Sequence, residues 1–280
     1  MRIKRGSWLK MKVNDVLKRN DGIDTEKKKL ALMQVLSLSS VGVSLHLDNN
    51  LSFYNYIKYL FIVKRLVKGV PIQYISHKAY FYNRWFRVNK HTLIPRVETE
   101  YLVNDAKMII DKYFSSSVKI LDIGTGSGVI AITLAESSDK YFVTATDISR
   151  KALKVAKSND NKSLVKFVHT DLYSSIDDKF DVVISNPPYI RNDSLLVSPE
   201  VLKYEPHFAL YGGDDGLLFY RRIFSDIKRI VNDRNIICFE TGEEQNDLIE
   251  EIALGYFPNA KIIKKNDLNG FNRYIFIINE

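Results

Sequence analysis

The sequence predicts an α/β protein built around a mostly parallel sheet, preceded by a smaller helical region. From residue 101 onward, short apolar stretches alternate with amphipathic ones, which is the pattern of strands alternating with helices. The apolar stretches have few polar interruptions, as expected for parallel strands that helices cover on both faces. Residues 11–70 instead carry apolar side chains at three- and four-residue spacings, which predicts helices.

Local breaks in these patterns set the expected boundaries. The helical region ends at Gly69, and Pro71 follows it closely, a combination that stops a helix. Aromatic residues then alternate around Asn83-Arg84, which predicts a short β-hairpin. We therefore expect a helical domain over residues 1–78, a hairpin linker over 79–97 and an α/β domain over 98–280.

Two unusual motifs of the α/β domain follow expected strands. Ligands of parallel sheets bind at the carboxyl ends of the strands, and the motifs at 122–128 and 186–189 both lie at such ends. The expected strands are 117–124, 141–147, 165–171, 180–186, 235–241 and 273–279, and the expected helices are 128–137, 149–160 and 216–231.

Size and composition exclude several classes of protein. The chain has 280 residues, of which 45% are hydrophobic, so it can bury a substantial core. No apolar run approaches the length of a membrane span, and a single cysteine excludes an internal disulfide. The five histidines show no metal-ligand spacing. We expect a monomer that acts without a metal or a membrane, in a reducing cytoplasm.

The net charge of +8 is distributed unevenly along the chain. Residues 1–100 hold 19 Lys and Arg against 7 Asp and Glu, whereas residues 101–280 hold 22 against 26. A basic first third suggests an acidic or nucleic-acid-bearing partner. A solvated basic surface with no partner explains the same counts equally well.

The glycine-rich turn "LDIGTGSGVIAITLA" indicates a nucleoside site. Gly124, Gly126 and Gly128 stand between an expected strand and an expected helix, where the backbone can pass close to a ligand and amides of the helix are free. Asp147 closes the next strand and can accept hydrogen bonds from both ribose hydroxyls. A tight turn without a ligand is the alternative, and the acid one strand later makes it weaker.

The residues around this turn favour S-adenosylmethionine as the ligand. A dinucleotide fingerprint would place its third glycine at position 129, where this chain has Val129. Two carboxylates, Asp122 and Asp147, suit the sulfonium and ammonium groups of S-adenosylmethionine better than a diphosphate. Asp171-Leu172 follow the next strand, where such sites hold the adenine.

The second motif, "SNPPYI", predicts a clamp for a planar nitrogen. Pro187 and Pro188 fix the backbone and carry no N–H, so the corner offers carbonyl oxygens without a competing donor. The amide oxygen of Asn186 adds a second acceptor beside the Pro187 carbonyl, and Tyr189 adds an aromatic surface. A planar –NH2 group is a poor nucleophile, and two acceptors that hold it can align it with a methyl carbon. A rigid loop without chemistry is the alternative.

These motifs together resemble the peptide-chain release factor glutamine N5-methyltransferases. The resemblance covers nearly the whole chain, and the most particular segments are "LIPRVETEYLV" at 93–103 and "YEPHFALYGGDDGLLFYRRI" at 204–223. It implies a class I S-adenosylmethionine-dependent methyltransferase fold, which is Rossmann-like with seven strands, and an N-terminal helical bundle that docks the release factor. Three departures stand out, since the family usually has proline where this chain has Val97, often glutamate where it has Val70, and commonly glycine where it has His77.

The resemblance also implies roles, position by position. The expected enzyme is bacterial-type and methylates the glutamine of a Gly-Gly-Gln loop, with S-adenosylmethionine as cofactor and a release factor as partner. Asn186, Pro187 and Tyr189 are the implied catalytic residues, and the implied substrate-binding residues add Pro188, Arg96 and Glu98. The implied cofactor-binding residues are Gly124, Thr125, Gly126, Ser127, Gly128, Asp147, Asp171, Leu172 and Asn186.

Two other functions fit parts of the same sequence. A nucleic-acid methyltransferase that modifies the adenine amino group faces the same chemical problem, and the basic first third favours it. However, no target-recognition domain remains once residues 101–280 form the catalytic fold, so we expect no direct nucleic-acid substrate. A non-catalytic binding protein with this fold would be expected to lack Asp122, Asp147 or Asn186, and all three are present.

Overall fold

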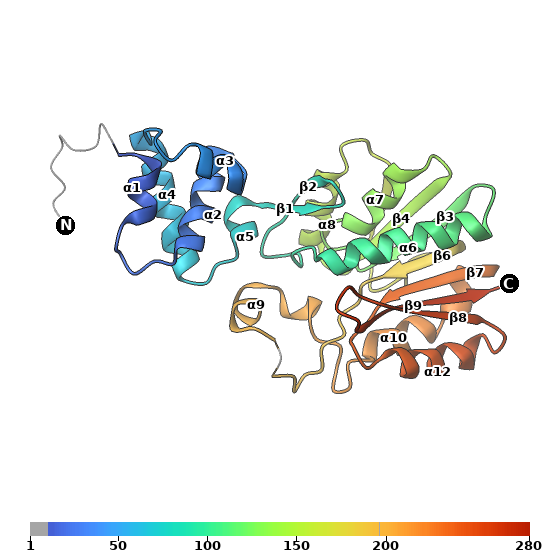
Figure 1. Cartoon of the computed structure of the whole chain (residues 1–280). Coiled ribbons are helices and arrows are strands. Elements are labelled where there is room, and N and C mark those ends of the chain that lie inside the picture. The colour runs from blue at the N-terminus through green and yellow to red at the C-terminus, as the bar shows by residue number, and fades with distance from the viewer. Residues whose placement is uncertain (1–10, 196) are drawn as a thin grey trace. The chain divides into compact units, whose positions relative to one another are not determined.

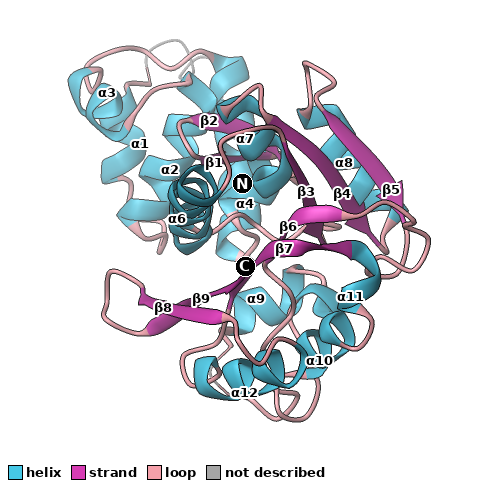
Figure 2. Cartoon of the chain, turned by 90° about the vertical axis from the view of Figure 1, so that its right-hand side faces the viewer, coloured by secondary structure: helices cyan, strands magenta, loops and turns pink. Residues whose placement is uncertain are grey.

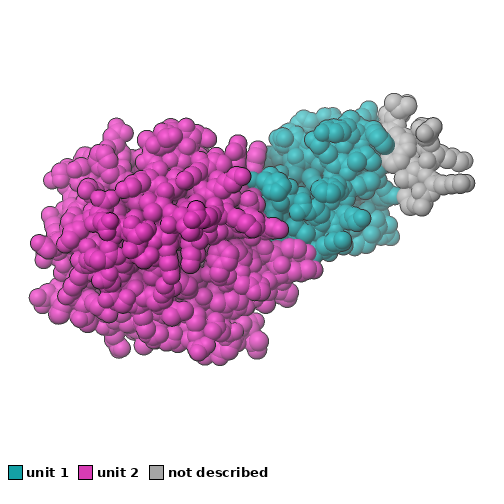
Figure 3. Space-filling view, turned by 180° about the vertical axis from the view of Figure 1, so that it is seen from behind, with its two compact units in different colours: residues 1–77 teal, residues 78–280 magenta. Residues whose placement is uncertain are grey.

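The chain forms two compact units, Met1–His77 and Lys78–Glu280 (Figure 3). The structure, a computed structural model, describes residues 11–195 and 197–280. Each unit has a hydrophobic core of its own. The predicted hairpin belongs to the second unit.

The first unit is helical, as the apolar spacing predicts (Figure 1). Its core includes Leu32, Val43 and Tyr59, each buried between helices. Side chains of Asp24, Ser39 and Ser52 cap three of these helices by accepting from backbone N–H groups. The helices are α1 Val13–Lys18, α2 Thr25–Leu36, α3 Ser40–Leu45, α4 Phe53–Val67 and α5 Ile72–Ser76.

His77 ends α5 in the left-handed conformation, with φ of 57°. Its backbone N–H donates to the carbonyl of Gln73 and closes the last turn. Glycine adopts this conformation without steric cost, and it is the commonest residue at such helix ends. The geometry therefore explains why the resembling family often has glycine here.

The predicted hairpin is present, with its turn one residue earlier than expected. The strands are β1 Lys78–Phe81 and β2 Arg84–Arg87, paired antiparallel. Tyr82 and Asn83 form the loop with φ of 46° and 63°, as a two-residue type I′ turn requires. Arg84 is thus the first residue of β2, and centring the turn on Asn83-Arg84 was wrong by one position.

Seven strands of the described residues form one mostly parallel sheet, which confirms the predicted fold class. Their order is β5-β4-β3-β6-β7-β9-β8, and only the pairs that include β9 are antiparallel. The strands are β3 Val118–Ile123, β4 Tyr141–Asp147, β5 Val165–His169, β6 Phe180–Ser185, β7 Val231–Glu240, β8 Lys261–Asn266 and β9 Asn272–Asn279. Strand β8 is absent from the set expected from residue patterns.

Helices cover both faces of this sheet (Figure 2). One core lies under α6 Val97–Tyr113 and α7 Val129–Ser137, and includes Phe81 and Phe86 of the hairpin. The other lies under α10 Leu218–Phe224, α11 Ile227–Ile230 and α12 Asn246–Tyr256. Helix α8 Arg150–Asn159 packs along β4 and β5, while α9 Pro199–Tyr204 follows the loop after β6.

The first residue of helix α6 is Val97, where the resembling family usually has proline. Proline is favoured at the first position of a helix, so the family's usual proline fits this place.

Cys238, the chain's single cysteine, is fully buried in β7. Among the described residues, none of the helices has the length and apolar content that a bilayer crossing requires.

Candidate active site

Three neighbouring strands bring distant segments together at their carboxyl ends. Ile123 of β3 pairs with Ser185 of β6, and Ser185 pairs with Phe239 of β7. The next residues along these strands are Gly124, Asn186 and Glu240. Because paired strands lie about 4.8 Å apart, the register alone places the glycine turn beside the Asn-Pro-Pro corner.

A cavity of about 250 Å³ lies at this edge of the sheet. Both predicted motifs line it, together with segments that precede α6 and α10. The predicted site residues that line the cavity are Arg96, Gly124, Thr125, Gly126, Ser127, Asp147, Asp171, Leu172, Asn186, Pro187 and Pro188. The predicted residues outside its lining are Gly128, Tyr189 and Glu98.

The glycine turn keeps the floor of the cavity open. Gly124 and Gly126 have φ of 72° and 57°, a conformation that residues with a Cβ rarely adopt. A Cβ on Gly124 would meet no atom within 4 Å, so it would project into open space that a ligand can use. Gly128 differs, because a Cβ there would lie 2.9 Å from Ile132 Cδ1 and 3.1 Å from Ala156 Cβ. Gly128 therefore permits close packing of α7 against α8.

Asp147 fastens the turn to the end of β4. Its Oδ2 accepts from the Gly126 backbone N–H at 2.9 Å, and its Oδ1 accepts from Ser149 N–H at 2.7 Å. Burial raises the pKa of Asp147, although these two hydrogen bonds oppose the shift. Each carboxylate oxygen can accept a second hydrogen bond, so the group still has capacity for a ligand hydroxyl.

Asp122 supports the turn from beneath and is fully buried outside the cavity lining. Its Oδ2 accepts from the Thr125 hydroxyl at 2.6 Å. Its Oδ1 has no hydrogen-bond partner among the described residues. Burial raises the pKa of Asp122 to about 7. Asp122 thus shapes the turn, and contact with a ligand would have to pass through Thr125.

The Asn-Pro-Pro corner is held by backbone bonds to a segment near residue 211. Ile190 N–H donates to the Leu210 carbonyl at 3.0 Å, and Gly212 N–H donates to the Ile190 carbonyl at 2.8 Å. The Gln245 side chain donates to the Tyr189 carbonyl at 2.9 Å. The corner is therefore fixed from two sides, in keeping with the rigidity that its prolines predict.

Glycines 212 and 216 make this packing possible. A Cβ on Gly212 would lie 2.5 Å from the Pro188 carbonyl oxygen, and one on Gly216 would lie 2.4 Å from the Tyr189 carbonyl oxygen. Both distances are far inside van der Waals contact, so neither position has room for a side chain. The "YGGDDG" segment, residues 211–216, thus packs closely against the corner.

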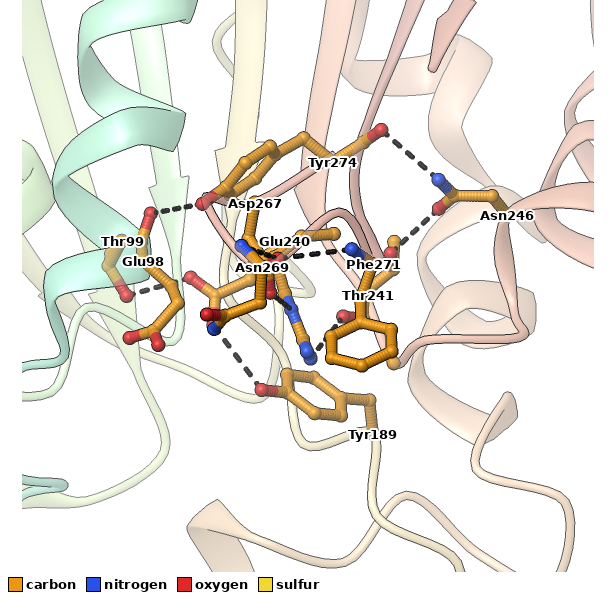
Figure 4. A network of polar contacts seen from close by, with 12 residues as sticks. Glu98, Thr99, Tyr189, Glu240, Thr241, Asn246, Asp267, Asn269, Phe271 and Tyr274 are labelled. Carbon is orange, nitrogen blue, oxygen red and sulfur yellow. Dashed lines mark hydrogen bonds and ion pairs between the residues drawn. The ribbon is translucent and has the colours of Figure 1, made fainter. Parts of the chain in front are cut away.

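The corner's side chains connect to α6 and β7. The Asn186 amide nitrogen donates to Thr99 Oγ1 at 3.1 Å, and the Tyr189 hydroxyl donates to Glu240 Oε1 at 3.3 Å. The backbone carbonyl of Glu98 accepts from the Tyr274 hydroxyl at 2.8 Å (Figure 4). The predicted substrate contacts of Tyr189 and Glu98 remain predictions, since neither residue reaches the cavity lining.

Two ion pairs border the cavity. Arg96 pairs with Glu205, a buried carboxylate whose second oxygen accepts from Ile94 N–H at 3.0 Å. This contact joins the segment before α6 to the segment after α9. Arg222 pairs with Asp171 at 2.8 Å, beside Leu172.

Known proteins are similar in sequence to most of this chain. Residues 101–203 match the family described as the methyltransferase small domain. A protein of Bacillus cereus named release factor glutamine methyltransferase is 35% identical, covering 95% of this chain and 99% of its own. A protein of the same name from Bacillus subtilis is 39% identical over 74% of this chain and 75% of its own.

The chain belongs to the release factor glutamine methyltransferase family. A methyltransferase from Pyrococcus furiosus shares the fold, with a TM-score of 0.53 and 17% identity, covering 77% of this chain and 96% of that one. The sequence-based resemblance and the predicted fold class are thereby confirmed.

The sequence alone assigns no individual role to Thr99, Glu205 or Glu240. Thr99 lines the cavity, and Glu240 links to it although they are 141 positions apart. Glu205 supports Arg96 from 109 positions away. The segments that contain these residues are distinctive, but only their three-dimensional proximity shows which residues act together.

Proposed function

We propose that the protein transfers a methyl group from S-adenosylmethionine to the side-chain amide nitrogen of the Gly-Gly-Gln glutamine in peptide-chain release factors. Membership in the family supports this activity, as do the names of relatives that align over nearly their whole length. The observation that carries the proposal is one cavity lined by both the glycine turn and the Asn-Pro-Pro corner.

The residues present fit the proposed cofactor. The open space above Gly124 leaves room for a ligand backbone, and Asp147 has capacity for ribose hydroxyls. Leu172 and Asp171 also line the cavity, and in this proposal they would flank the adenine. When bound, S-adenosylmethionine would supply an activated methyl group with a neutral thioether as the leaving group, and the methylated amide would release one N–H proton.

The Asn-Pro-Pro corner would hold the nitrogen that receives the methyl group. The Asn186 side-chain oxygen and the Pro187 carbonyl are acceptors, and the prolines place no backbone N–H among them. Two acceptors can hold both N–H groups of a glutamine amide and orient its nitrogen. The same acceptors stabilise the positive charge that develops there. The apolar residues of the lining limit access of water.

The first unit would dock the release factor. Helix α4 exposes Phe53, Tyr54 and Phe61 to solvent beside Lys58 and Lys64. Aromatic side chains next to cations favour an acidic protein surface that also offers apolar contacts. The excess of basic residues in the first third of the sequence supports the same role.

One assay tests the proposed activity and its main rival. Purified protein is incubated with S-adenosylmethionine labelled on the methyl group and with either a release factor or duplex DNA. We expect label on the release factor, located by mass spectrometry on the Gly-Gly-Gln glutamine, and none on DNA. Label on DNA with none on the release factor would reject the proposal in favour of a nucleic-acid methyltransferase.

A further inference from the structure

A buried carboxylate lies behind the Asn-Pro-Pro corner. Glu240 ends β7, is only 2% exposed and does not line the cavity. A carboxylate is costly to bury, and it needs hydrogen-bonding partners to remain in such a place. Its partners therefore indicate what it does (Figure 4).

Each carboxylate oxygen of Glu240 holds a side chain from a different element. Oε2 accepts from the hydroxyl of Thr99 on α6 at 2.7 Å. Oε1 accepts from the hydroxyl of Tyr189, in the loop after β6, at 3.3 Å. Thr99 Oγ1 in turn accepts from the amide nitrogen of Asn186 at 3.1 Å. A continuous path of hydrogen bonds thus runs from Glu240 through Thr99 to Asn186.

When Glu240 is ionised, the number of protons fixes the direction of these bonds. An ionised carboxylate only accepts, so the Thr99 hydroxyl must give its single proton to Glu240. The Thr99 oxygen can then only accept from Asn186. Asn186 must therefore present its NH2 group to Thr99, which leaves its amide oxygen for the cavity.

We propose that Glu240 is a positioning residue that, through Thr99, holds the Asn186 amide with its oxygen toward the methyl-accepting nitrogen. This inference rests on the proposed function, because an acceptor is needed there only if the substrate presents N–H groups. The second arm of Glu240 fixes Tyr189, so one carboxylate orients both polar side chains of the corner. Neither Thr99 nor Glu240 touches the reacting atoms in this role.

If the hydrogen bonds along this path ran in the opposite direction, the Asn186 amide would be turned around. If residue 240 carried a donor, it could donate to Thr99, and Thr99 could donate to the Asn186 oxygen. The amide would then turn and offer its NH2 group to the cavity. A donor facing the substrate NH2 group repels it and removes one of the two acceptors.

The surroundings of Glu240 are compatible with its ionised form near neutral pH. Burial raises its pKa to about 7, the Thr99 hydrogen bond and Arg273 oppose that rise, and Glu98 adds to it. Tyr220 donates to the Glu240 backbone carbonyl at 2.8 Å, and Tyr189 and Tyr274 are further ionisable groups beside this residue. We therefore expect kcat to increase as pH rises through about 7.

Glu240→Gln tests the path, since it keeps the shape and replaces one acceptor oxygen by a donor. We expect kcat for release-factor methylation to fall on the order of 100-fold, while the Kd for S-adenosylmethionine changes less than about twofold. Thr99→Val should produce a similar loss, and Thr99→Ser, which retains the hydroxyl, should recover most of it. Glu100→Gln is the matched control, because Glu100 lies on the same helix as Thr99 and its carboxylate accepts from the Tyr82 backbone N–H at 3.0 Å.

A comparison of the single variants at Glu240 and Thr99 with the double variant distinguishes a positioning role from a general loss of stability. If Glu240 acts through Thr99, the double variant should be little worse than either single one, because both remove the same restraint. Additive losses, or nearly normal kcat in both Glu240→Gln and Thr99→Val, would overturn the inference while leaving the proposed function intact.

A second measurement needs no substrate. In nitrogen-15 NMR, the Asn186 side-chain amide can be assigned from its absence in Asn186→Asp. The proton of this amide that faces Thr99 should exchange slowly with solvent in wild type and in Thr99→Ser. In Thr99→Val and Glu240→Gln we expect its exchange to be at least about tenfold faster, which corresponds to about 1.4 kcal/mol. Equal exchange in all four proteins would reject the path. If wild type fails to methylate the release factor, the proposed function falls, and this measurement still decides the orientation of Asn186.

Discussion

At the scale of single residues, Asn186 and Asp147 separate two roles within one cavity. Asn186 follows β6 and belongs to the corner proposed to hold the substrate, whereas Asp147 ends β4 and fastens the glycine turn. Replacement of either side chain should therefore affect a different measured quantity.

Asn186→Ala should lower the methylation rate and spare cofactor binding. The variant loses the side-chain acceptor that orients the substrate nitrogen, a contribution worth on the order of 100-fold in rate. Single-turnover rates measure the loss, and calorimetry with S-adenosylmethionine serves as the control. A rate near that of wild type would contradict the acceptor role.

Asp147→Ala should weaken cofactor binding. It removes the proposed acceptor for the ribose and also the bonds to Gly126 and Ser149, so we expect the Kd to rise at least about tenfold, or ~1.4 kcal/mol. Ser149→Ala is a useful comparison, because it keeps the carboxylate and its backbone donors. Unchanged affinity in Asp147→Ala would remove the ribose assignment.

Asp122 should make stability depend on pH. Its pKa is raised from 3.8 to about 7 in the folded protein, so the folded state binds a proton more tightly than the unfolded chain. The free energy of unfolding should therefore fall as pH rises between these values, by up to about 1.4 kcal/mol per pH unit.

Asp122→Asn should flatten this dependence, because an amide does not titrate. Urea unfolding at several pH values from 4 to 8 measures the slope, and the exposed loop residue Asp177 provides the control Asp177→Asn. The contribution of Glu240, which has the same sign, remains in both variants. An identical slope in wild type and Asp122→Asn would show that Asp122 titrates normally.

At the scale of elements, the glycines of the "YGGDDG" segment limit how the corner can be built. Gly212→Ala would place a Cβ 2.5 Å from the Pro188 carbonyl oxygen, and backbone atoms on both sides would have to move. We expect a loss of stability of ~1–3 kcal/mol and a lower kcat, measured by thermal unfolding and by methylation.

Gly255→Ala is the matched control. Gly255 lies in α12, and a Cβ there would meet no atom within 4 Å. Alanine is favoured over glycine inside a helix by roughly 0.5–1 kcal/mol, so this variant should be slightly more stable than wild type. Similar behaviour of the two variants would mean that Gly212 has no special packing role.

The elements that the sequence predicts well are those with a strong local pattern. The strands that end at Ile123, Asp147 and Ser185 are almost wholly buried, so their apolar runs are unmistakable. Strand β8 reads "KIIKKN" and is only partly buried at the edge of the sheet, so its apolar pattern is too short to stand out.

The site, too, could be predicted only where its residues form a local motif. Motifs confined to one turn, such as Gly124–Gly128 or Asn186–Tyr189, can be read directly. Contacts such as Thr99 with Glu240 depend on strand order and register, which no local pattern encodes. Likewise, the clash that restricts Gly212 involves the Pro188 carbonyl oxygen, more than twenty positions away.

At the scale of the whole molecule, the two units carry different proposed tasks. If the first unit docks the release factor, charge reversal on α4 should weaken recognition and leave chemistry intact. We expect Lys58→Glu with Lys64→Glu to raise KM for the release factor about tenfold, or ~1.4 kcal/mol, with kcat little changed and with a weaker dependence of KM on salt.

Two lysines at the opposite edge of the sheet from the cavity provide the control. Lys140 precedes β4 and Lys157 lies in the last turn of α8, and both are exposed. Reversal of this pair changes the net charge equally, so an equal rise in KM would point to long-range electrostatics in place of a docking surface on α4.

The burial of Cys238 has a practical consequence. The only thiol of the chain is enclosed in the central sheet, where burial raises its pKa, so maleimide reagents should leave the native protein unmodified. Any cysteine engineered onto the surface would then be the sole attachment point for a fluorophore. Two such cysteines would allow the distance between two chosen points to be followed in solution without first replacing Cys238.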